Sequence, residues 1–184
     1  KKLASQPTLS RFFNRLDDDT LRQFYHLQRE MRKIVYAIKN PDIILLDLDS
    51  TLFDTYGHQE GEGFNFHYKN HGYHPLVCFD GNTGDLLKIE LSDGTVYSCT
   101  GVTDFLQPLL DEFLQSYPKT SLLLRGDSGF ATPDLYKQCE TNGTSYVIRL
   151  KENSVLRNLA AYADDLLTEK TRLNQVDYAV EYGE

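Results

Sequence analysis

The chain is 184 residues long and 40% hydrophobic, with 12 Tyr and 10 Phe, a composition that suits one globular domain with an aromatic-rich core. Its net charge of −8 argues against indiscriminate coating of nucleic acid, and no apolar run approaches the roughly 18–20 residues of a membrane span. The three cysteines, Cys78, Cys99 and Cys139, fit neither a disulfide framework nor a zinc motif and are typical of reduced thiols in a cytosolic protein.

Residues 1–40 are predicted to form a basic N-terminal arm and helix. Nine Lys or Arg stand against four Asp or Glu in residues 1–39, whereas the remainder of the chain is strongly acidic. An irregular arm over 3–15 precedes a helix that begins near Thr20, is capped by Asp18 or Asp19, and ends before Pro41. Apolar residues at helical spacing predict the side of this helix that faces the core: Leu21, Phe24, Met31, Ile34, Val35 and Ile38.

A second stripe on the same helix carries His26 and three cations, Arg22, Arg29 and Lys33. Charge runs of this kind are usually solvated helix faces. Because the basic residues gather in this part of an acidic chain, contact with DNA phosphates is the functional alternative, and we carry these three side chains forward as candidate DNA-binding residues.

Residues 41–175 are predicted to form an α/β core, and residues 176–184 to begin a further strand or insertion. Turn-linked strands come first, at 43–51, 75–80 and 85–91, with a half-exposed strand at 64–68 between the first two. Helices and strands then alternate, with helices at 103–117, 132–142 and 153–171 and strands at 121–126 and 145–150. The order β-β-β-α-β-α-β-α, preceded by an N-terminal helix, predicts a mixed sheet with helices on both faces, as in the ribonuclease H-like fold.

Two of these strands end in acids. The apolar run Ile43–Leu46 leads into Asp47, Asp49 and Ser50-Thr51, and the run Leu122–Leu124 leads into Arg125 and Asp127. Carboxylates at the end of a buried strand are costly unless something compensates for them, and a divalent cation is the usual compensation. Two such strands lying side by side would bring two carboxylates together, which predicts a metal-dependent phosphoryl-transfer site.

Several blocks together resemble one family, the DDE transposases of bacterial insertion sequences, and more narrowly the transposase DDE domain group 1. The blocks are 3–11, 46–51, 58–61, 73–76, 124–130 and 146–151. The resemblance implies a ribonuclease H-like core with an Asp-Asp-Glu triad that binds two Mg2+ (or Mn2+) ions and performs DNA strand cleavage and transfer at the ends of the element. The implied partners are DNA, as terminal inverted repeats and target, and a second copy of the protein in a homodimeric synaptic complex in the bacterial cytoplasm.

The resemblance also assigns roles to particular residues. The family's first Asp lies in an Asp-x-Thr pattern that falls on Asp49 with Thr51, and its second Asp falls on Asp127. We expect Asp49 and Asp127 to be catalytic metal ligands, and Asp47 and Thr51 to support them without binding metal. Arg125 is expected either to hold a phosphate of DNA or to pair with a carboxylate.

The third carboxylate departs from the family pattern. The broader superfamily carries its Glu in Tyr-x-x-Arg-x-x-x-Glu, and here Tyr146 and Arg149 begin that spacing but Asn153 occupies the last position. We therefore expect the catalytic Glu downstream of residue 184, and the 184-residue chain by itself to be inactive.

Two alternatives stay open at this point. Asp47-Leu48-Asp49-Ser50-Thr51 also fits the Asp-x-Asp-x-Thr motif of haloacid dehalogenase-like phosphatases, in which Asp47 would be the nucleophile and Asp49 the general acid/base. That fold needs an all-parallel crossover sheet, whereas residues 64–91 predict antiparallel strands. The second alternative is a catalytically inert DNA-binding remnant whose acids are merely solvated.

Overall fold

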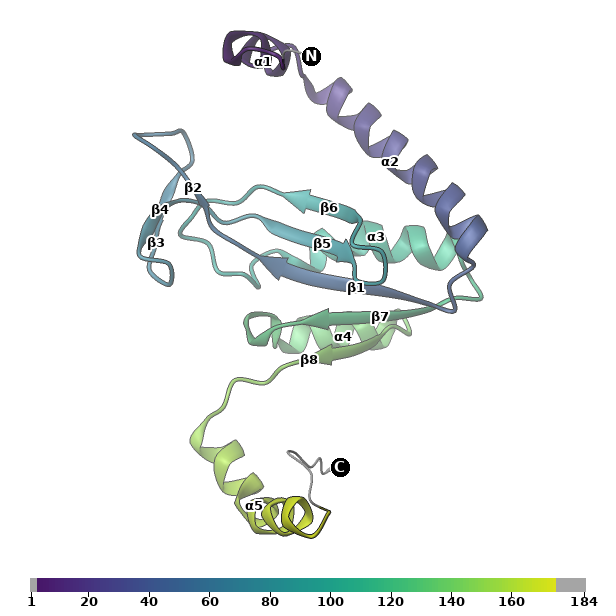
Figure 1. The fold of residues 1–184 in the computed structure, drawn as a ribbon, viewed down its shortest axis with the longest axis vertical. Coiled ribbons are helices and arrows are strands. Elements are labelled where there is room, and N and C mark those ends of the chain that lie inside the picture. The colour runs from purple at the N-terminus through teal and green to yellow at the C-terminus, as the bar shows by residue number, and fades with distance from the viewer. Residues whose placement is uncertain (1–2, 175–184) are drawn as a thin grey trace.

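The structure, a computed structural model, describes residues 3–174; the strand predicted at 176–182 lies outside this range. Five helices and eight strands follow one another (Figure 1). The helices are α1 (Gln6–Phe13), α2 (Asp18–Lys39), α3 (Val102–Ser116), α4 (Pro133–Thr141) and α5 (Ser154–Asn174). The strands are β1 (Ile43–Ser50), β2 (Phe53–Asp54), β3 (Gly63–Asn65), β4 (Asn70–Tyr73), β5 (Leu76–Asp80), β6 (Leu86–Glu90), β7 (Ser121–Gly126) and β8 (Ser145–Ile148).

The main sheet has the strand order β6-β5-β1-β7-β8. Strand β1 pairs antiparallel with β5 and parallel with β7, and β7 pairs parallel with β8. Short turns can join only antiparallel neighbours, whereas α3 and α4 are the crossovers that parallel pairs require. The predicted ribonuclease H-like order is therefore confirmed, and the all-parallel sheet that the phosphatase interpretation requires is excluded.

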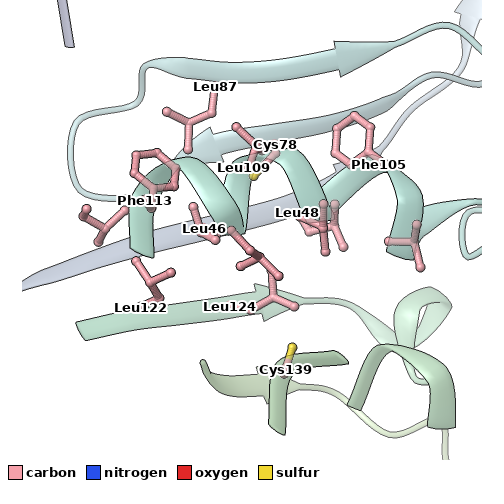
Figure 2. Packing of buried hydrophobic residues seen from close by; sticks show 14 of the residues in the cluster. Leu46, Leu48, Cys78, Leu87, Phe105, Leu109, Phe113, Leu122, Leu124 and Cys139 are labelled. Carbon is pink, nitrogen blue, oxygen red and sulfur yellow. The ribbon is translucent and has the colours of Figure 1, made fainter. Parts of the chain in front are cut away.

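The core lies between the main sheet and helices α3 and α4. Alternate residues of β1 (Ile44, Leu46 and Leu48) point to this side and are at most 3% exposed. They pack with α3 through Phe105 and Phe113, and Figure 2 shows both helices beside the strands that carry these leucines. Because strand side chains alternate between faces, the same β1 turns Asp47 and Asp49 to the opposite side.

The expectation of helices on both faces of the sheet is wrong for the part of the chain that the structure describes. On the face opposite α3 and α4, side chains from three different strands stay exposed: Ile43 at 48%, Phe79 at 37% and Val147 at 61%. Helix α5 contributes no residue to the described core cluster, and Figure 1 shows it apart from the sheet. Among residues 3–174, no helix combines the length and the apolar character needed to cross a membrane.

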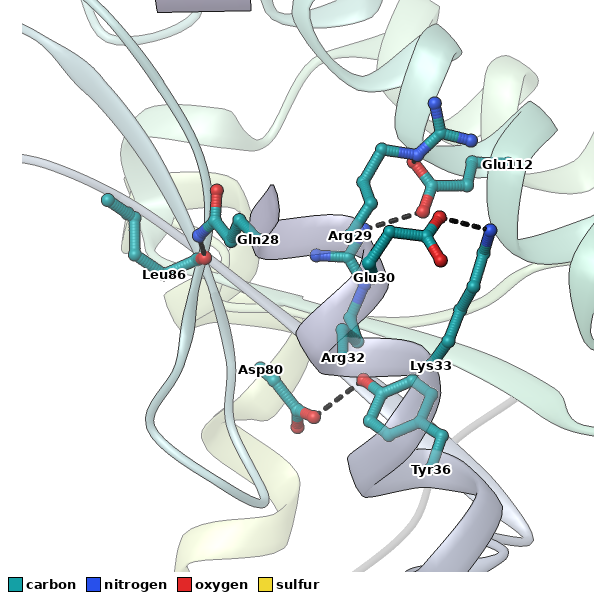
Figure 3. Close-up of polar contacts among 9 residues, drawn as sticks. All are labelled: Gln28, Arg29, Glu30, Arg32, Lys33, Tyr36, Asp80, Leu86 and Glu112. Atoms are coloured by element: carbon teal, nitrogen blue, oxygen red, sulfur yellow. Dashed lines mark hydrogen bonds and ion pairs between the residues drawn. The ribbon is translucent and has the colours of Figure 1, made fainter. Parts of the chain in front are cut away.

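Helix α2 faces the core with a side other than the predicted one. Leu21, Phe24, Met31, Ile34 and Ile38 are exposed, and of the predicted set only Val35 is half-buried and packed against the core. The buried side chains are Arg32 and Tyr36. Figure 3 shows why: the Tyr36 hydroxyl donates to the Asp80 carboxylate at 2.6 Å, so polar contacts decide how this helix lies.

Other differences are local. The predicted arm contains α1, because a proline in the first helical turn, here Pro7, removes only an N–H that would lack a helical partner anyway. Asp17, not Asp18 or Asp19, caps α2, accepting the Thr20 N–H at 2.8 Å. The strand predicted at 64–68 ends at Asn65. The chain between β1 and β5 forms a separate small sheet with the strand order β2-β4-β3.

Candidate active site at the ends of strands β1 and β7

The parallel pairing of β1 with β7 places Asp49 and Asp127 at one end of the main sheet. The register runs from Ile43 opposite Ser121 to Leu48 opposite Gly126, with a constant offset. Continued by one residue, it sets Asp49 beside Asp127, and neighbouring strands lie about 5 Å apart. The backbone pairing therefore agrees with the expectation that the two strands end side by side, each with a carboxylate.

Each of these carboxylates is fixed by a backbone N–H group. Asp49 Oδ1 accepts from the Ser50 N–H at 2.7 Å. Asp127 opens a short 3-10 helix, and its Oδ1 accepts from the Gly129 N–H at 2.8 Å. Both residues are exposed, and within residues 3–174 neither has an ion-pair partner. Oriented carboxylates open to solvent are the donor set that a hard divalent cation takes.

Within residues 3–174, no group of three His, Cys, Asp or Glu side chains gathers at a point that could hold a metal ion. Asp49 and Asp127 are two such side chains at one end of the sheet, and their role in an Asp-Asp-Glu site stays a prediction. The position of the third carboxylate stays a prediction as well.

Asp49 and Asp127 line one cavity of about 580 Å³. The residues around it come from several parts of the chain: the ends of β1 and β7, the β3–β4 hairpin with His74 just after it, residues 94–98, and Lys151 after β8. The hairpin contributes aromatic rings, of which Phe66 is 83% exposed and Tyr68 44% exposed, and Tyr97 is 81% exposed. Two acids, a lysine and aromatic rings thus line one cavity, a combination that suits an anionic, aromatic ligand once a cation offsets the acids.

Buried polar contacts hold the aromatic wall in place. Asn65, 6% exposed, donates from its side-chain amide to the Gly94 carbonyl at 2.9 Å and accepts the N–H groups of His67 and Tyr68. Gly94 fits there because a Cβ atom would overlap the carbonyl oxygens of Gly63 and Gly72. One residue thereby ties the hairpin to the 94–98 segment.

The 94–98 segment is also tied to the carboxylate end of β1. The Ser50 and Ser98 hydroxyls are hydrogen-bonded at 2.7 Å, and His74 Nδ1 lies 3.0 Å from the Val96 carbonyl oxygen. The 94–98 wall of the cavity and the end of β1 that carries Asp49 therefore belong to one connected unit.

Asp47 lies outside this cavity, although it points to the same side of β1 as Asp49. It stands directly opposite Arg125 in the β1–β7 register, and the guanidinium binds it in a fork, with Nε 2.8 Å from Oδ1 and Nη2 bonded to Oδ2. This is the carboxylate pairing that the sequence left open for Arg125. The pKa of Arg125 is raised by its hydrogen bond to Asp47 and then by the charge of that carboxylate.

The candidate DNA-binding cations of α2 have carboxylate partners within the chain. Arg22 pairs with Asp19. Arg29 Nε lies 3.0 Å from Glu112, and Lys33 Nζ lies 2.6 Å from Glu30 (Figure 3). None of the three lines the cavity with Asp49 and Asp127. Thr51 follows β1 with an exposed side chain, so the roles predicted for it and for this stripe stay predictions.

Sequence reasoning missed several residues of the cavity, among them Lys151, Ser98, Tyr97 and the aromatic pair Phe66 and Tyr68. A signal existed for the hairpin, because Phe64-Asn65-Phe66-His67-Tyr68 is dense in rings and follows a glycine-rich segment. For Lys151 the only signal was its position just after a strand parallel to β7, since parallel strands end at the same edge of a sheet.

Comparison with known proteins places the chain in a family. Among solved structures it is similar to the piggyBac transposase in a synaptic complex with hairpin DNA, at 17% identity and a TM-score of 0.40, over 60% of this chain and 24% of that chain. It is also similar to the catalytic core domain of BIV integrase, at 14% identity and a TM-score of 0.37, over 74% of each chain. The chain thus spans about a quarter of the piggyBac chain, and no curated protein matches it. The family model described as transposase DDE domain group 1 matches residues 1–184, and the chain belongs to that family.

Proposed function

We propose that this chain carries two of the metal-binding carboxylates of a transposase that cleaves and joins DNA strands at the ends of an insertion sequence, with Asp49 and Asp127 as those ligands. The observation that supports this most directly is that the two acids, from neighbouring parallel strands, line one cavity. Membership of the transposase family supports the reaction class, and the shared cavity supports the choice of residues.

The donor set fits a hard divalent cation. Both ligands are carboxylates, each has one oxygen oriented by a backbone N–H, and both are open to solvent. When bound, Mg2+ or Mn2+ would supply Lewis-acid stabilisation of charge on the phosphodiester oxygens. The proposal assigns to Asp49 and Asp127 the binding of that cation, and to the predicted Glu beyond residue 184 the completion of the site.

The cavity walls suit DNA near the point of cleavage. Lys151 lines the cavity and offers an ammonium group to a phosphate. The exposed rings of Phe66 and Tyr97 offer faces on which unpaired bases stack. Arg22, Arg29, Lys33 and Arg125 remain candidate phosphate contacts, which would have to exchange their present carboxylate partners for DNA. Transposon ends and target DNA are the proposed substrates, and the pairing of two ends calls for two copies of the protein.

Substitution of the two carboxylates tests the proposal in the full-length protein. Asp49→Asn and Asp127→Asn should each abolish strand cleavage and leave binding to the transposon end within about twofold, because they remove ligands and no DNA-contacting cation. Asp47→Asn should be milder. Asp134→Asn is the matched control, since Asp134 is an exposed acid of the first turn of α4 and lies outside the cavity.

A readout independent of cleavage is Mn2+ binding, followed by electron paramagnetic resonance. Asp49→Asn and Asp127→Asn should weaken it, and Asp134→Asn should not. Cleavage that survives both substitutions would exclude Asp49 and Asp127 as the catalytic acids. A protein that binds the transposon end but does not cleave it would favour the inert-remnant alternative. A covalent aspartyl-phosphate on Asp47 would restore the phosphatase interpretation against the evidence of the sheet.

A further inference from the structure

Helix α2 exposes a continuous line of large apolar side chains that nothing in the described chain covers. Five residues form it, and we call them the α2 seam: Phe24 (51% exposed), Leu27 (55%), Met31 (58%), Ile34 (63%) and Ile38 (80%). Isolated exposed hydrophobic residues are ordinary, but an aligned set of this size marks an interaction surface.

The spacing of the seam identifies the shape of its partner. The steps between its members are three, four, three and four residues, which is the alternation of a and d positions in a coiled coil. The residues that hold α2 to the sheet lie on a neighbouring face of the helix: Tyr25 and Gln28 donate to backbone carbonyls of β6, and Tyr36 is buried. The seam is therefore free to meet another helix.

A second copy of α2, running antiparallel, satisfies the pattern. In an antiparallel coiled coil a positions face d positions, and the register in which Phe24 faces Ile34 of the second copy also sets Leu27 against its Met31. The same register sets residue 19 against residue 39, so that α2, which spans Asp18–Lys39, overlaps along its whole length. A two-fold axis then relates the copies, as isologous interfaces require.

Charge at the helix ends favours the same direction. The first turn of α2 carries Asp18 and Asp19, and the last turn carries Lys39. Antiparallel pairing brings the acidic start of each helix to the basic end of the other, whereas parallel pairing would bring like ends together. Near the axis Glu30 approaches its own copy, and in each chain Lys33 lies 2.6 Å from that carboxylate.

A groove beside the seam gives the partner side chains a place to pack. Between α2 and the start of β6 lies a cavity of about 370 Å³, lined largely by apolar side chains that include Phe24, Met31, Val35 and Leu86. Its walls join the seam to the body of the domain. We propose that the α2 seam is a self-association surface on which two copies of this chain pair through antiparallel α2 helices.

This proposal names a surface for the pairing of two copies suggested above, yet its test uses no DNA and no metal. Sedimentation of the 184-residue chain over a range of concentrations should show a monomer–dimer equilibrium. Ile34→Glu should weaken dimerisation by about 100-fold, because each dimer would bury two unpaired charges. His26→Glu is the matched control: it introduces the same side chain at an exposed α2 position off the seam, and it should leave the dimer intact.

Cysteine pairing tests the direction and the register. With Cys99 replaced by Ser, a mixture of the Leu27→Cys and Met31→Cys chains should form a disulfide between the two variants faster than either variant pairs with itself. Self-pairing of each variant would mean parallel helices and would overturn the proposed arrangement. A chain that is monomeric at every concentration, or an Ile34→Glu variant that dimerises like the parent chain, would overturn the surface itself. Cleavage by the full-length protein is not a readout here, so the cleavage proposal stands or falls separately.

Discussion

Acidic residues occupy two regions of this chain in opposite ways. Under α2, Asp80 is 2% exposed, and one of its carboxylate oxygens accepts from the Tyr36 hydroxyl at 2.6 Å (Figure 3). The other oxygen accepts from the Asn82 N–H at 2.8 Å. At the ends of β1 and β7, Asp49 and Asp127 are exposed, and each is held by one backbone N–H. The Asp80 carboxylate has hydrogen-bond donors from the protein on both oxygens, whereas Asp49 and Asp127 each keep oxygens that can bind a ligand.

The contrast teaches how to separate structural from functional carboxylates. A buried acid must find its partners within the fold, because an unsatisfied polar group in the interior is costly. An acid that leaves its oxygens open in a cavity contributes little to the stability of the fold. The two regions should therefore respond differently to the same substitution.

The largest effect should come from Asp80→Ala. It removes the acceptor of the buried Tyr36 hydroxyl and of the Asn82 N–H, and it leaves space in the core, so the free energy of unfolding should fall by about 3 kcal/mol. Asp49→Ala, the comparison variant, should change it by no more than about 0.5 kcal/mol. Urea denaturation of both variants measures the difference. Equal losses would show that the acids at the strand ends are structural as well.

A smaller effect should appear in alkaline solution. Burial and then the hydrogen bond to Asp80 raise the pKa of Tyr36 above its ordinary value of 10.0. Burial also raises the pKa of Cys78, to about 12 from 9.0. In the unfolded chain these groups lose their protons at lower pH than in the folded chain, so the unfolded state binds fewer protons and stability must fall as pH rises through about 9 to 12.

Tyr36→Phe isolates the tyrosine's part of this pH dependence. The variant should lose stability at pH 7, because the acceptor Asp80 loses its donor, but its stability should fall less steeply above pH 10 than that of the parent chain. Thermal unfolding followed by circular dichroism at pH 7, 9, 10 and 11 provides the comparison. If the stability of both proteins fell equally steeply with pH, Tyr36 would not be responsible for the loss of stability in alkaline solution.

The same two regions explain what the sequence could and could not predict. The strands that carry Asp49 and Asp127 were predictable because apolar runs that end in acids report both the strand and its end. The orientation of α2 was not, because Arg32 and Tyr36, the residues it buries, are polar-tipped, and their partners Glu112 and Asp80 lie far away in the sequence. Hydrophobic periodicity therefore predicted as buried the face of α2 that is exposed in the structure.

The cavity wall was hidden for a related reason. Its strands, β2, β3 and β4, are two to four residues long, too short for a two-residue alternation to stand out from a glycine-rich loop. What fixes them is tertiary: the amide of Asn65 reaches the Gly94 carbonyl, and only glycine fits where Gly94 meets Gly63 and Gly72. Such contacts join segments roughly thirty residues apart and leave no local pattern.

The smallest effect should come from the ion pair between Asp47 and Arg125, which joins β1 to β7. Its side chains are 33% and 53% exposed, and pairs open to water contribute about 0.2–1 kcal/mol, less as salt is added. A double-mutant cycle of Asp47→Asn and Arg125→Met should thus give a coupling energy in that range at low salt and a smaller one at 1 M salt. Arg125 neutralises Asp47, which lies two residues before Asp49 on the same side of β1. Arg125→Met should therefore leave a negative charge near the proposed cation site and strengthen Mn2+ binding by the chain. Adding Asp47→Asn should reverse that gain. Unchanged Mn2+ affinity in Arg125→Met would mean that Asp47 is electrostatically separate from the pair Asp49 and Asp127.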